Sequence, residues 1–168
     1  MKKKLLLALV LLSSAGYLGY RIINKINDKL EIEERIKTIP DFSFFNMQGI
    51  KFTQNNLKNK PIVFVYFNSD CDYCQSEATK IQEHLHDFKN TQLVFVSFEK
   101  KDNILRFAKK HQLYNKDNVI FLEDIKGEFA TIFDVNSIPY IVVYNANKKL
   151  QQKFKGATKV NKILEVLK

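Results

Sequence analysis

The chain opens with a basic cluster followed by an apolar segment. Lys2–Lys4 precede the apolar run Leu5–Leu12, and apolar character resumes after four small residues. A signal peptide with this pattern would be cleaved after Ala15, whereas an uncleaved anchor would extend to about Ile23, close to the roughly 20 residues that cross a bilayer. The return of apolar residues favours the anchor. Residues 1–23 are therefore predicted to be a signal anchor or signal peptide, with the lysines cytoplasmic and the remainder exported.

The next segment, residues 24–38, has a helical pattern but too few apolar residues for a core element. Its thin apolar seam has roughly helical spacing, begins at Ile22 just before the segment, and continues with Ile26, Leu30 and Ile36. Pro40 is expected to stop the helix. We predict a helical stalk or linker here, followed by one globular domain over residues 39–168.

Within the domain, the spacing of apolar residues changes repeatedly between the pattern of a strand and the pattern of a helix. Pro61–Asn68 is nearly all apolar and rich in β-branched and aromatic residues, which is typical of a strand buried on both faces. Apolar residues then recur every three or four positions, which predicts a helix over Cys71–Phe88. The further predicted strands are 42–45, 50–53, 92–98, 119–122, 140–145 and 150–155, and the further helices are 103–111, 127–133 and the end of the chain. This alternation predicts an α/β fold with a hairpin at one edge.

The candidate chemistry lies where the buried strand ends and the helix begins, at Cys71-Asp72-Tyr73-Cys74. Two cysteines three positions apart in a first helical turn lie on the same side, so their sulfurs can approach bonding distance. The ring that they close is small and stabilises the fold little, which leaves the bond free to cycle. A CxxC at such a junction is a redox signature, and it needs no further cofactor.

The two thiols are predicted to have different roles. The helix amino terminus carries partial positive charge and stabilises a thiolate at Cys71, the attacking nucleophile. Cys74 lies on the apolar stripe and is expected to be buried, as the resolving thiol. Asp70 and Asp72 flank the nucleophile and oppose the helix dipole, which would make the couple more reducing. An equal alternative makes both aspartates solvated turn or cap residues.

Glu77 follows one turn after Cys74, beside the apolar stripe. A partly buried carboxyl group there would have a raised pKa and could take or give a proton as the thiols react. The alternative is an ordinary exposed helix glutamate.

Composition argues against several other functions. The formal charge is +9, but the lysines are scattered and no basic run is interleaved with aromatic residues, so no nucleic-acid binding is predicted. Two cysteines cannot form a disulfide-stapled scaffold. A zinc site normally needs four ligands. Of the three histidines, His84 and His86 are expected on opposite sides of one helix and His111 is distant in sequence, so no metal site is predicted.

A second motif, Ile138-Pro139, stands directly before a predicted strand, where proline is tolerated. The order of strand, CxxC, helix, and later Ile-Pro, strand, hairpin and helix resembles the thioredoxin-like family. In that family the proline is cis and packs against the CxxC, and the residue before it offers backbone hydrogen bonds to the substrate. The resemblance implies these roles for Pro139 and Ile138, and substrate contacts for Asp72 and Tyr73.

Within this family, the chain is similar to the membrane-bound TlpA/ResA-type thiol–disulfide oxidoreductases, with sequences of the kind common in Bacteroidetes. The shared features are the amino-terminal anchor, Pro40-Asp41-Phe42 at the hairpin, the CxxC, and Glu77. The chain departs from the family at Asp70, where tryptophan is usual, at Val65, where thioredoxins carry a buried carboxylate, and in lacking proline between the cysteines. It also lacks the Pro-x-x-x-Thr-x-x-Cys of peroxiredoxins.

The resemblance implies a thioredoxin-like fold, with a central mixed sheet flanked by helices and an amino-terminal hairpin extension. It implies a single-pass protein of the inner membrane with its catalytic domain in the periplasm. There it would exchange disulfides with protein substrates, with reduction favoured, and be recharged by a membrane thiol donor. The alternatives are a dedicated reductant in c-type cytochrome maturation, a copper(I) chaperone that uses the same cysteine pair, and a non-catalytic binding module.

Overall fold

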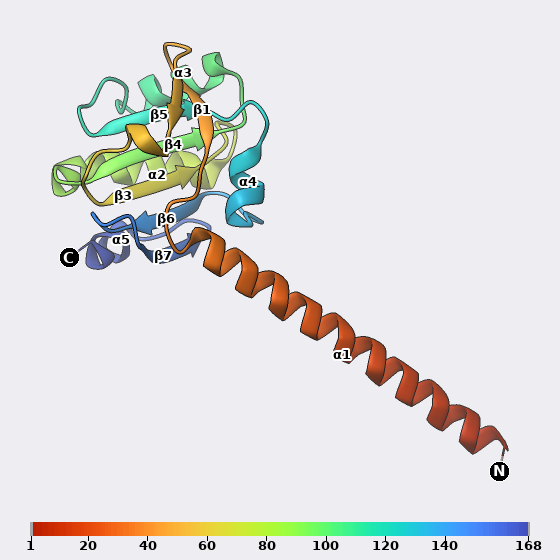
Figure 1. Ribbon diagram of the computed structural model, residues 1–168. Helices are drawn as coiled ribbons and strands as arrows, with labels where there is room; N and C mark the ends of the chain where they lie inside the picture. Colours follow the sequence, from red (N-terminus) through yellow and green to blue (C-terminus); the bar gives the residue numbers. More distant parts are fainter. Residues whose placement is uncertain (1, 168) are drawn as a thin grey trace. The chain divides into compact units, whose positions relative to one another are not determined.

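The computed structural model describes residues 2–167, with side chains from residue 12 onward. The chain forms two compact units that divide between Arg35 and Ile36. The first unit contains all but the last residue of the helix α1 (Lys2–Ile36), which runs without a break through the predicted anchor and most of the predicted stalk (Figure 1). The predicted apolar run Leu5–Leu12 lies almost entirely outside the residues whose side chains are described.

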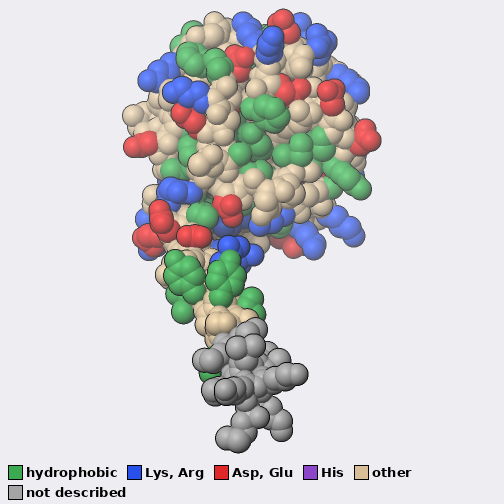
Figure 2. All heavy atoms as spheres, turned by 90° about the vertical axis from the view of Figure 1, so that its right-hand side faces the viewer, with side chains coloured by type: hydrophobic (Ala, Val, Ile, Leu, Met, Phe, Trp, Pro, Cys, Tyr) green, Lys and Arg blue, Asp and Glu red, His purple; other side chains and the backbone are tan. Residues whose placement is uncertain are grey.

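The described side chains of α1 are largely exposed, and apolar ones gather beside the grey atoms in Figure 2. The large exposed apolar residues on this helix are Leu12, Tyr17, Leu18, Tyr20, Ile22, Ile23, Ile26 and Leu30. In the described part of the chain, no helix combines the length and the apolar character that a membrane crossing requires.

The second unit is built on a seven-stranded mixed sheet with the order β2-β1-β5-β4-β3-β6-β7 (Figure 1). The three central strands are parallel, and the outer strands pair antiparallel. The strands are β1 (Ser43–Asn46), β2 (Lys51–Thr53), β3 (Ile62–Tyr66), β4 (Gln92–Ser97), β5 (Val119–Glu123), β6 (Tyr140–Tyr144) and β7 (Leu150–Lys155). The predicted hairpin forms β1 and β2 and extends the sheet beyond β5, so the predicted α/β fold with a mixed sheet is confirmed.

Alternate residues of β3 serve two separate cores, as expected for a strand buried on both faces. Val63 and Val65 belong to a core that includes residues of α2 (Asp72–Glu83), α3 (Lys101–Lys110) and α5 (Val160–Val166). Phe64 points into an aromatic core on the opposite face, against Phe129 and Phe133 of α4 (Glu128–Phe133). The central strand is thereby fixed from both sides, and with it the turn that follows.

The globular unit begins at Ile36. The sequence pattern predicts a start three residues later, at residue 39. Ile36 is fully buried, and its carbonyl oxygen accepts a hydrogen bond of 2.8 Å from the Tyr144 hydroxyl. The amide of Leu150 donates to the carbonyl of Lys37 at 2.9 Å. These contacts make Ile36 and Lys37 part of the globular unit, and they join residues too far apart in sequence for a local pattern to reveal.

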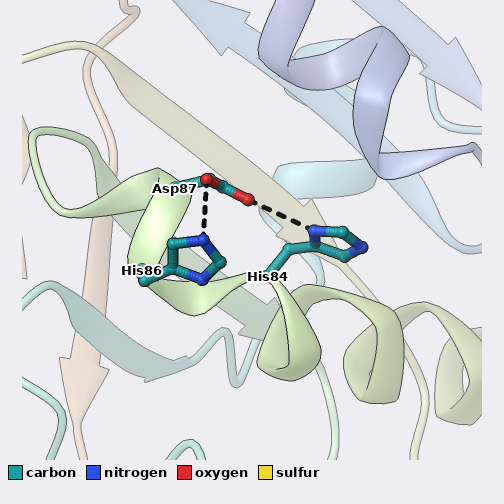
Figure 3. A network of polar contacts seen from close by, with 3 residues as sticks. All are labelled: His84, His86 and Asp87. Carbon is teal, nitrogen blue, oxygen red and sulfur yellow. Dashed lines mark hydrogen bonds and ion pairs between the residues drawn. The ribbon is translucent and has the colours of Figure 1, made fainter.

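The helix predicted over Cys71–Phe88 is shorter than expected. It ends at Glu83, and the short 3-10 helix η2 (Leu85–Phe88) follows. Because the α-helix stops there, His84 and His86 both reach the Asp87 carboxylate, at 3.2 and 3.0 Å (Figure 3). The prediction that these histidines lie on opposite sides of one helix is therefore wrong. Even so, no group of three or more ligand side chains suited to a metal ion occurs among the described residues.

Candidate active site

A tight polar turn connects β3 to α2 and places the first cysteine. The amide of Phe67 still bonds to the carbonyl of Val96 on β4, at 3.1 Å, and the chain then leaves the sheet. The Asn68 side chain accepts a hydrogen bond of 2.8 Å from the Asp70 amide, and its carbonyl accepts one of 3.2 Å from the Cys71 amide. This Asx-type turn brings the chain into the start of the helix at Cys71.

Cys71 is the amino-terminal cap of α2 and is half-buried. Its sulfur accepts a hydrogen bond of 3.2 Å from the Cys74 amide, and its carbonyl accepts the helical hydrogen bond of Gln75, at 2.9 Å. A cap side chain normally accepts an unpaired amide of the first turn, and here a sulfur does so. The sulfur therefore lies at the amino terminus of the helix, which carries partial positive charge.

Cys74 has a contrasting environment. Its side chain is only 2 % exposed and belongs to the apolar core beneath α2. Both cysteines are free thiols. Burial raises the pKa of the Cys74 thiol well above its ordinary value, and the hydrogen bond with the Cys71 side chain raises it further. The pair thus combines one accessible sulfur with one buried thiol that keeps its proton, as the predicted roles of nucleophile and resolver require.

Glu77 is completely buried, so the alternative of an exposed helix glutamate is wrong. Its Oε2 accepts a hydrogen bond of 2.8 Å from the Thr158 amide. Its Oε1 is buried and has no hydrogen-bond partner among the described residues. Burial raises the pKa of this carboxyl group, while the Thr158 bond acts in the opposite direction. The Glu77 charge in turn raises the pKa of Cys74, which couples the two groups electrostatically.

The Ile138–Pro139 peptide bond is cis. Pro139 is buried, and Ile138 packs against the same apolar core as the two cysteines. The carbonyl of Pro139 accepts a hydrogen bond of 2.9 Å from the Gly156 amide, two residues before the Thr158 amide that reaches Glu77. One short segment after β7 therefore contacts both the proline loop and the buried carboxyl group.

The residues between and before the cysteines face solvent. Tyr73 is 68 % exposed, and Asp70 and Asp72 are also exposed. Asp72 is the first residue of α2 and Asp70 lies in the preceding turn. These positions make Asp72 and Tyr73 accessible to a macromolecular substrate.

Sequence reasoning did not single out two side chains that fix the turn before Cys71, Glu99 and Gln75. Glu99 accepts hydrogen bonds from both the amide and the hydroxyl of Ser69, each 2.6 Å long. Gln75 donates to the Ser69 carbonyl at 2.5 Å. Because Glu99 lies thirty positions from Ser69, no local motif could have indicated this contact.

Comparison with known proteins places this site in a family. Residues 36–153 match the AhpC/TSA family. The chain belongs to this family. Over 173 aligned residues it is 24% identical to the thiol-disulfide oxidoreductase ResA of Bacillus cereus, covering all of this chain and 98% of the relative. The predicted resemblance to the ResA type is thereby confirmed.

Solved structures confirm the thioredoxin-like fold. A secreted Mycobacterium tuberculosis disulfide oxidoreductase homologous to E. coli DsbE matches 80% of this chain and 97% of its own, with a TM-score of 0.65 and 19% identity. StoA from Bacillus subtilis matches 79% of this chain and 99% of its own, with a TM-score of 0.60 and 18% identity. At these identities the likeness concerns the fold.

Proposed function

We propose that this protein is a membrane-tethered thiol–disulfide oxidoreductase that reduces protein disulfides outside the cytoplasm. The observation that carries the proposal is the Cys71 sulfur, which caps the amino terminus of α2 and accepts the amide of the buried Cys74. The predicted enzyme class, a protein disulfide oxidoreductase, is supported by family membership and by the activity for which the ResA relative is named.

The reaction begins with the Cys71 thiolate. It attacks one sulfur of a substrate disulfide, forms a mixed disulfide with that sulfur and releases the other as a thiolate. The Cys74 sulfur, after losing its proton, attacks the Cys71 sulfur and forms the Cys71–Cys74 disulfide. The second substrate sulfur leaves as a thiolate. Two electrons pass from the enzyme to the substrate, and a membrane-bound thiol donor then reduces the enzyme again. The exchange uses only these two sulfurs and no further cofactor.

Glu77 supplies the proton acceptor for the second half of this sequence. The Cys74 thiol is buried and its pKa is raised, so it attacks only when a nearby group accepts its proton. The Glu77 carboxyl group is buried on the same helix, and burial raises its own pKa, which makes its carboxylate a stronger base. The unpaired Oε1 provides a free lone pair for that proton.

The environment of Cys74 supports reduction over oxidation. A disulfide couple is a strong oxidant when its reduced form is stabilised, as happens when the thiolates are strongly favoured. Here burial disfavours the thiolate of Cys74. Cys74 therefore adds no thiolate stabilisation to the reduced form, which supports the proposed flow of electrons from the enzyme to its substrate.

Substrate recognition is assigned to the surface around Cys71. Ile138 and Pro139 lie against the core that contains both cysteines, and Tyr73 and Asp72 project from the first turn of α2. An extended peptide that carries a disulfide would pair with the backbone at Ile138 while its side chains contact Tyr73. Such backbone pairing gives affinity with little dependence on sequence.

Membrane attachment and export are proposed from the amino-terminal segment. Three lysines precede the apolar run, which favours retention of that end in the cytoplasm. The exposed apolar side chains of α1 would be covered by lipid in this arrangement. Basic and acidic side chains are interspersed on the face of the globular unit in Figure 2, which is compatible with a solvated domain.

The test uses the full-length protein in detergent, reduced beforehand, with insulin as the disulfide substrate. Wild-type protein should reduce insulin, Cys74→Ser should stop as a stable mixed disulfide, and Cys71→Ser should form none. The same trap in cells, with the Cys74→Ser variant, should recover exported substrates and so identify the pathway. Tight copper(I) binding without insulin reduction by the wild type would refute the oxidoreductase in favour of the chaperone.

A further inference from the structure

A buried carboxylate lies directly under the turn that presents the nucleophile. Glu99 follows β4 and is 9 % exposed. Its two oxygens accept four hydrogen bonds from side chains and backbone. These are Ser69 amide to Oε2 (2.6 Å), Ser69 hydroxyl to Oε1 (2.6 Å), Ser97 hydroxyl to Oε2 (3.2 Å) and Asn103 Nδ2 to Oε1 (3.3 Å). The two shortest both come from Ser69, two residues before Cys71.

The chemistry of these bonds makes Glu99 more than a solvated surface group. Burying a carboxylate is costly unless donors compensate it, and hydrogen bonds to a charged acceptor are about twice as strong as neutral ones. Neither a serine nor an amide side chain at position 99 could accept from both the Ser69 amide and the Ser69 hydroxyl while also accepting from Asn103. A carboxylate is the side chain that fits this donor set.

We propose that Glu99 is a positioning residue for Cys71, because it fixes the Ser69 turn that sets the first cysteine at the amino terminus of α2. The inference rests on the proposed thiol–disulfide chemistry. It assigns to Glu99 no contact with substrate or with the reacting sulfurs.

Glu99 acts on the Cys71 sulfur through the Ser69 turn, which is held by hydrogen bonds from two different segments of the chain. Glu99 holds the amide and side chain of Ser69, and Gln75 of α2 holds the Ser69 carbonyl at 2.5 Å. Gln75 is itself fixed by His111 Nε2 at 3.0 Å and by Lys110 Nζ at 2.7 Å. Releasing Ser69 would free the turn on the β4 side, so the cap sulfur would no longer be held over the first helical amides.

Suitable variants can separate the effect of the Glu99 charge from the effect of where its carboxylate lies. Glu99→Asp keeps the negative charge but is one methylene shorter, so it cannot reach the Ser69 donors from the same backbone. Ser69→Ala keeps the backbone bond and removes only the hydroxyl bond. Asp124→Asn is the matched control, since Asp124 is 1 % exposed and also accepts two backbone amides, but these belong to Glu128 and Phe129 of α4.

The experiment measures the second-order rate of Cys71 alkylation by iodoacetamide in full-length protein that carries Cys74→Ser. Circular dichroism first establishes that each variant is folded at the assay temperature. We expect Glu99→Asp to slow alkylation about tenfold, since small displacements of a reacting group cost this much or more. Ser69→Ala should slow it less, and should add nothing in the Glu99→Asp background. Asp124→Asn should lose stability but keep the wild-type rate.

Wild-type alkylation rates in both Glu99→Asp and Ser69→Ala would overturn the proposal, as would an equal slowing in Asp124→Asn. If Glu99→Asp does not fold, Ser69→Ala alone decides, since it removes a single hydroxyl. Alkylation needs no disulfide substrate, so the outcome is independent of insulin reduction. Failure of the wild type to reduce insulin would refute the proposed function, whereas unchanged alkylation in the variants would refute the role of Glu99.

Discussion

Replacing Glu77 by glutamine should uncouple stability from turnover. Glutamine has the same shape and can still accept the Thr158 amide through its oxygen. Its amide nitrogen would occupy the position of Oε1, which has no hydrogen-bond partner in the described part of the chain, so its burial should cost about as much as that of the protonated carboxyl group. The substitution therefore removes the titration and leaves the packing unchanged.

The sign of the stability change follows from the raised pKa of Glu77. The ordinary pKa of the group is 4.5, and burial raises it in the folded protein. The folded state binds the proton more tightly, so wild-type stability is lost as the pH rises from the ordinary value through the raised one. Each tenfold difference in proton affinity corresponds to about 1.4 kcal/mol. Glu77→Gln should match the wild type in stability at pH 4 and exceed it at pH 8, because only the wild type loses stability as the pH rises.

Catalysis should change in the opposite direction. Without a proton acceptor, attack of Cys74 on the mixed disulfide should slow by about a hundredfold, at the low end of the usual contribution of a general base. The first attack by Cys71 should keep its wild-type rate. In a single-turnover assay with reduced protein and a disulfide peptide, quenching with acid and separating species by mass should show the mixed disulfide accumulating. Denaturant unfolding at pH 4 and pH 8 gives the stability.

A variant that is more stable at pH 8 but slower in resolution cannot be explained by misfolding. Wild-type resolution in Glu77→Gln would refute the role of the carboxyl group as proton acceptor. A stability difference that is independent of pH would refute the assignment of the raised pKa to Glu77.

Three further outcomes follow from the structure. The Cys71–Cys74 couple, equilibrated with glutathione or dithiothreitol, should have a potential below about −200 mV, and a value near that of DsbA would contradict the reductant role. Tyr73→Ala should leave the melting temperature unchanged because the ring is 68 % exposed, while lowering kcat/KM for insulin. Tyr144→Phe should cost about 1–3 kcal/mol in urea unfolding, because the buried Ile36 carbonyl loses its donor, with insulin reduction unaffected.

Local patterns predicted much of this fold because its central elements are strongly patterned. The continuous apolar run at β3 and the helical spacing after Cys71 each placed an element within a few residues of its observed bounds. The end of α2 was missed because apolar spacing continues at Leu85 and Phe88, although the chain there turns into η2. The spacing of apolar residues indicates which side chains are buried, but a 3-10 turn can bury the same residues as an α-helix.

The polar framework of the site is a different case. Glu99 reaches Ser69 across thirty positions, and Thr158 reaches Glu77 across eighty-one. Both contacts join segments that become neighbours only in the folded protein, and both involve backbone amides, which every residue but proline possesses. The pattern of side-chain types along one sequence therefore cannot predict such contacts.

The burial of Glu77 could still have been derived from the sequence. Cys74, Ala78 and Ile81 form the apolar stripe of α2, and position 77 lies three residues after the first and next to the second. The spacing that buries the resolving thiol also buries this carboxyl group. One helical register therefore produces three environments: a half-buried sulfur at the cap, a thiol in the core whose pKa is raised by burial, and a buried carboxyl group on the same helix. The difference in chemistry between the two cysteines follows from their positions, three residues apart, relative to the start of one helix.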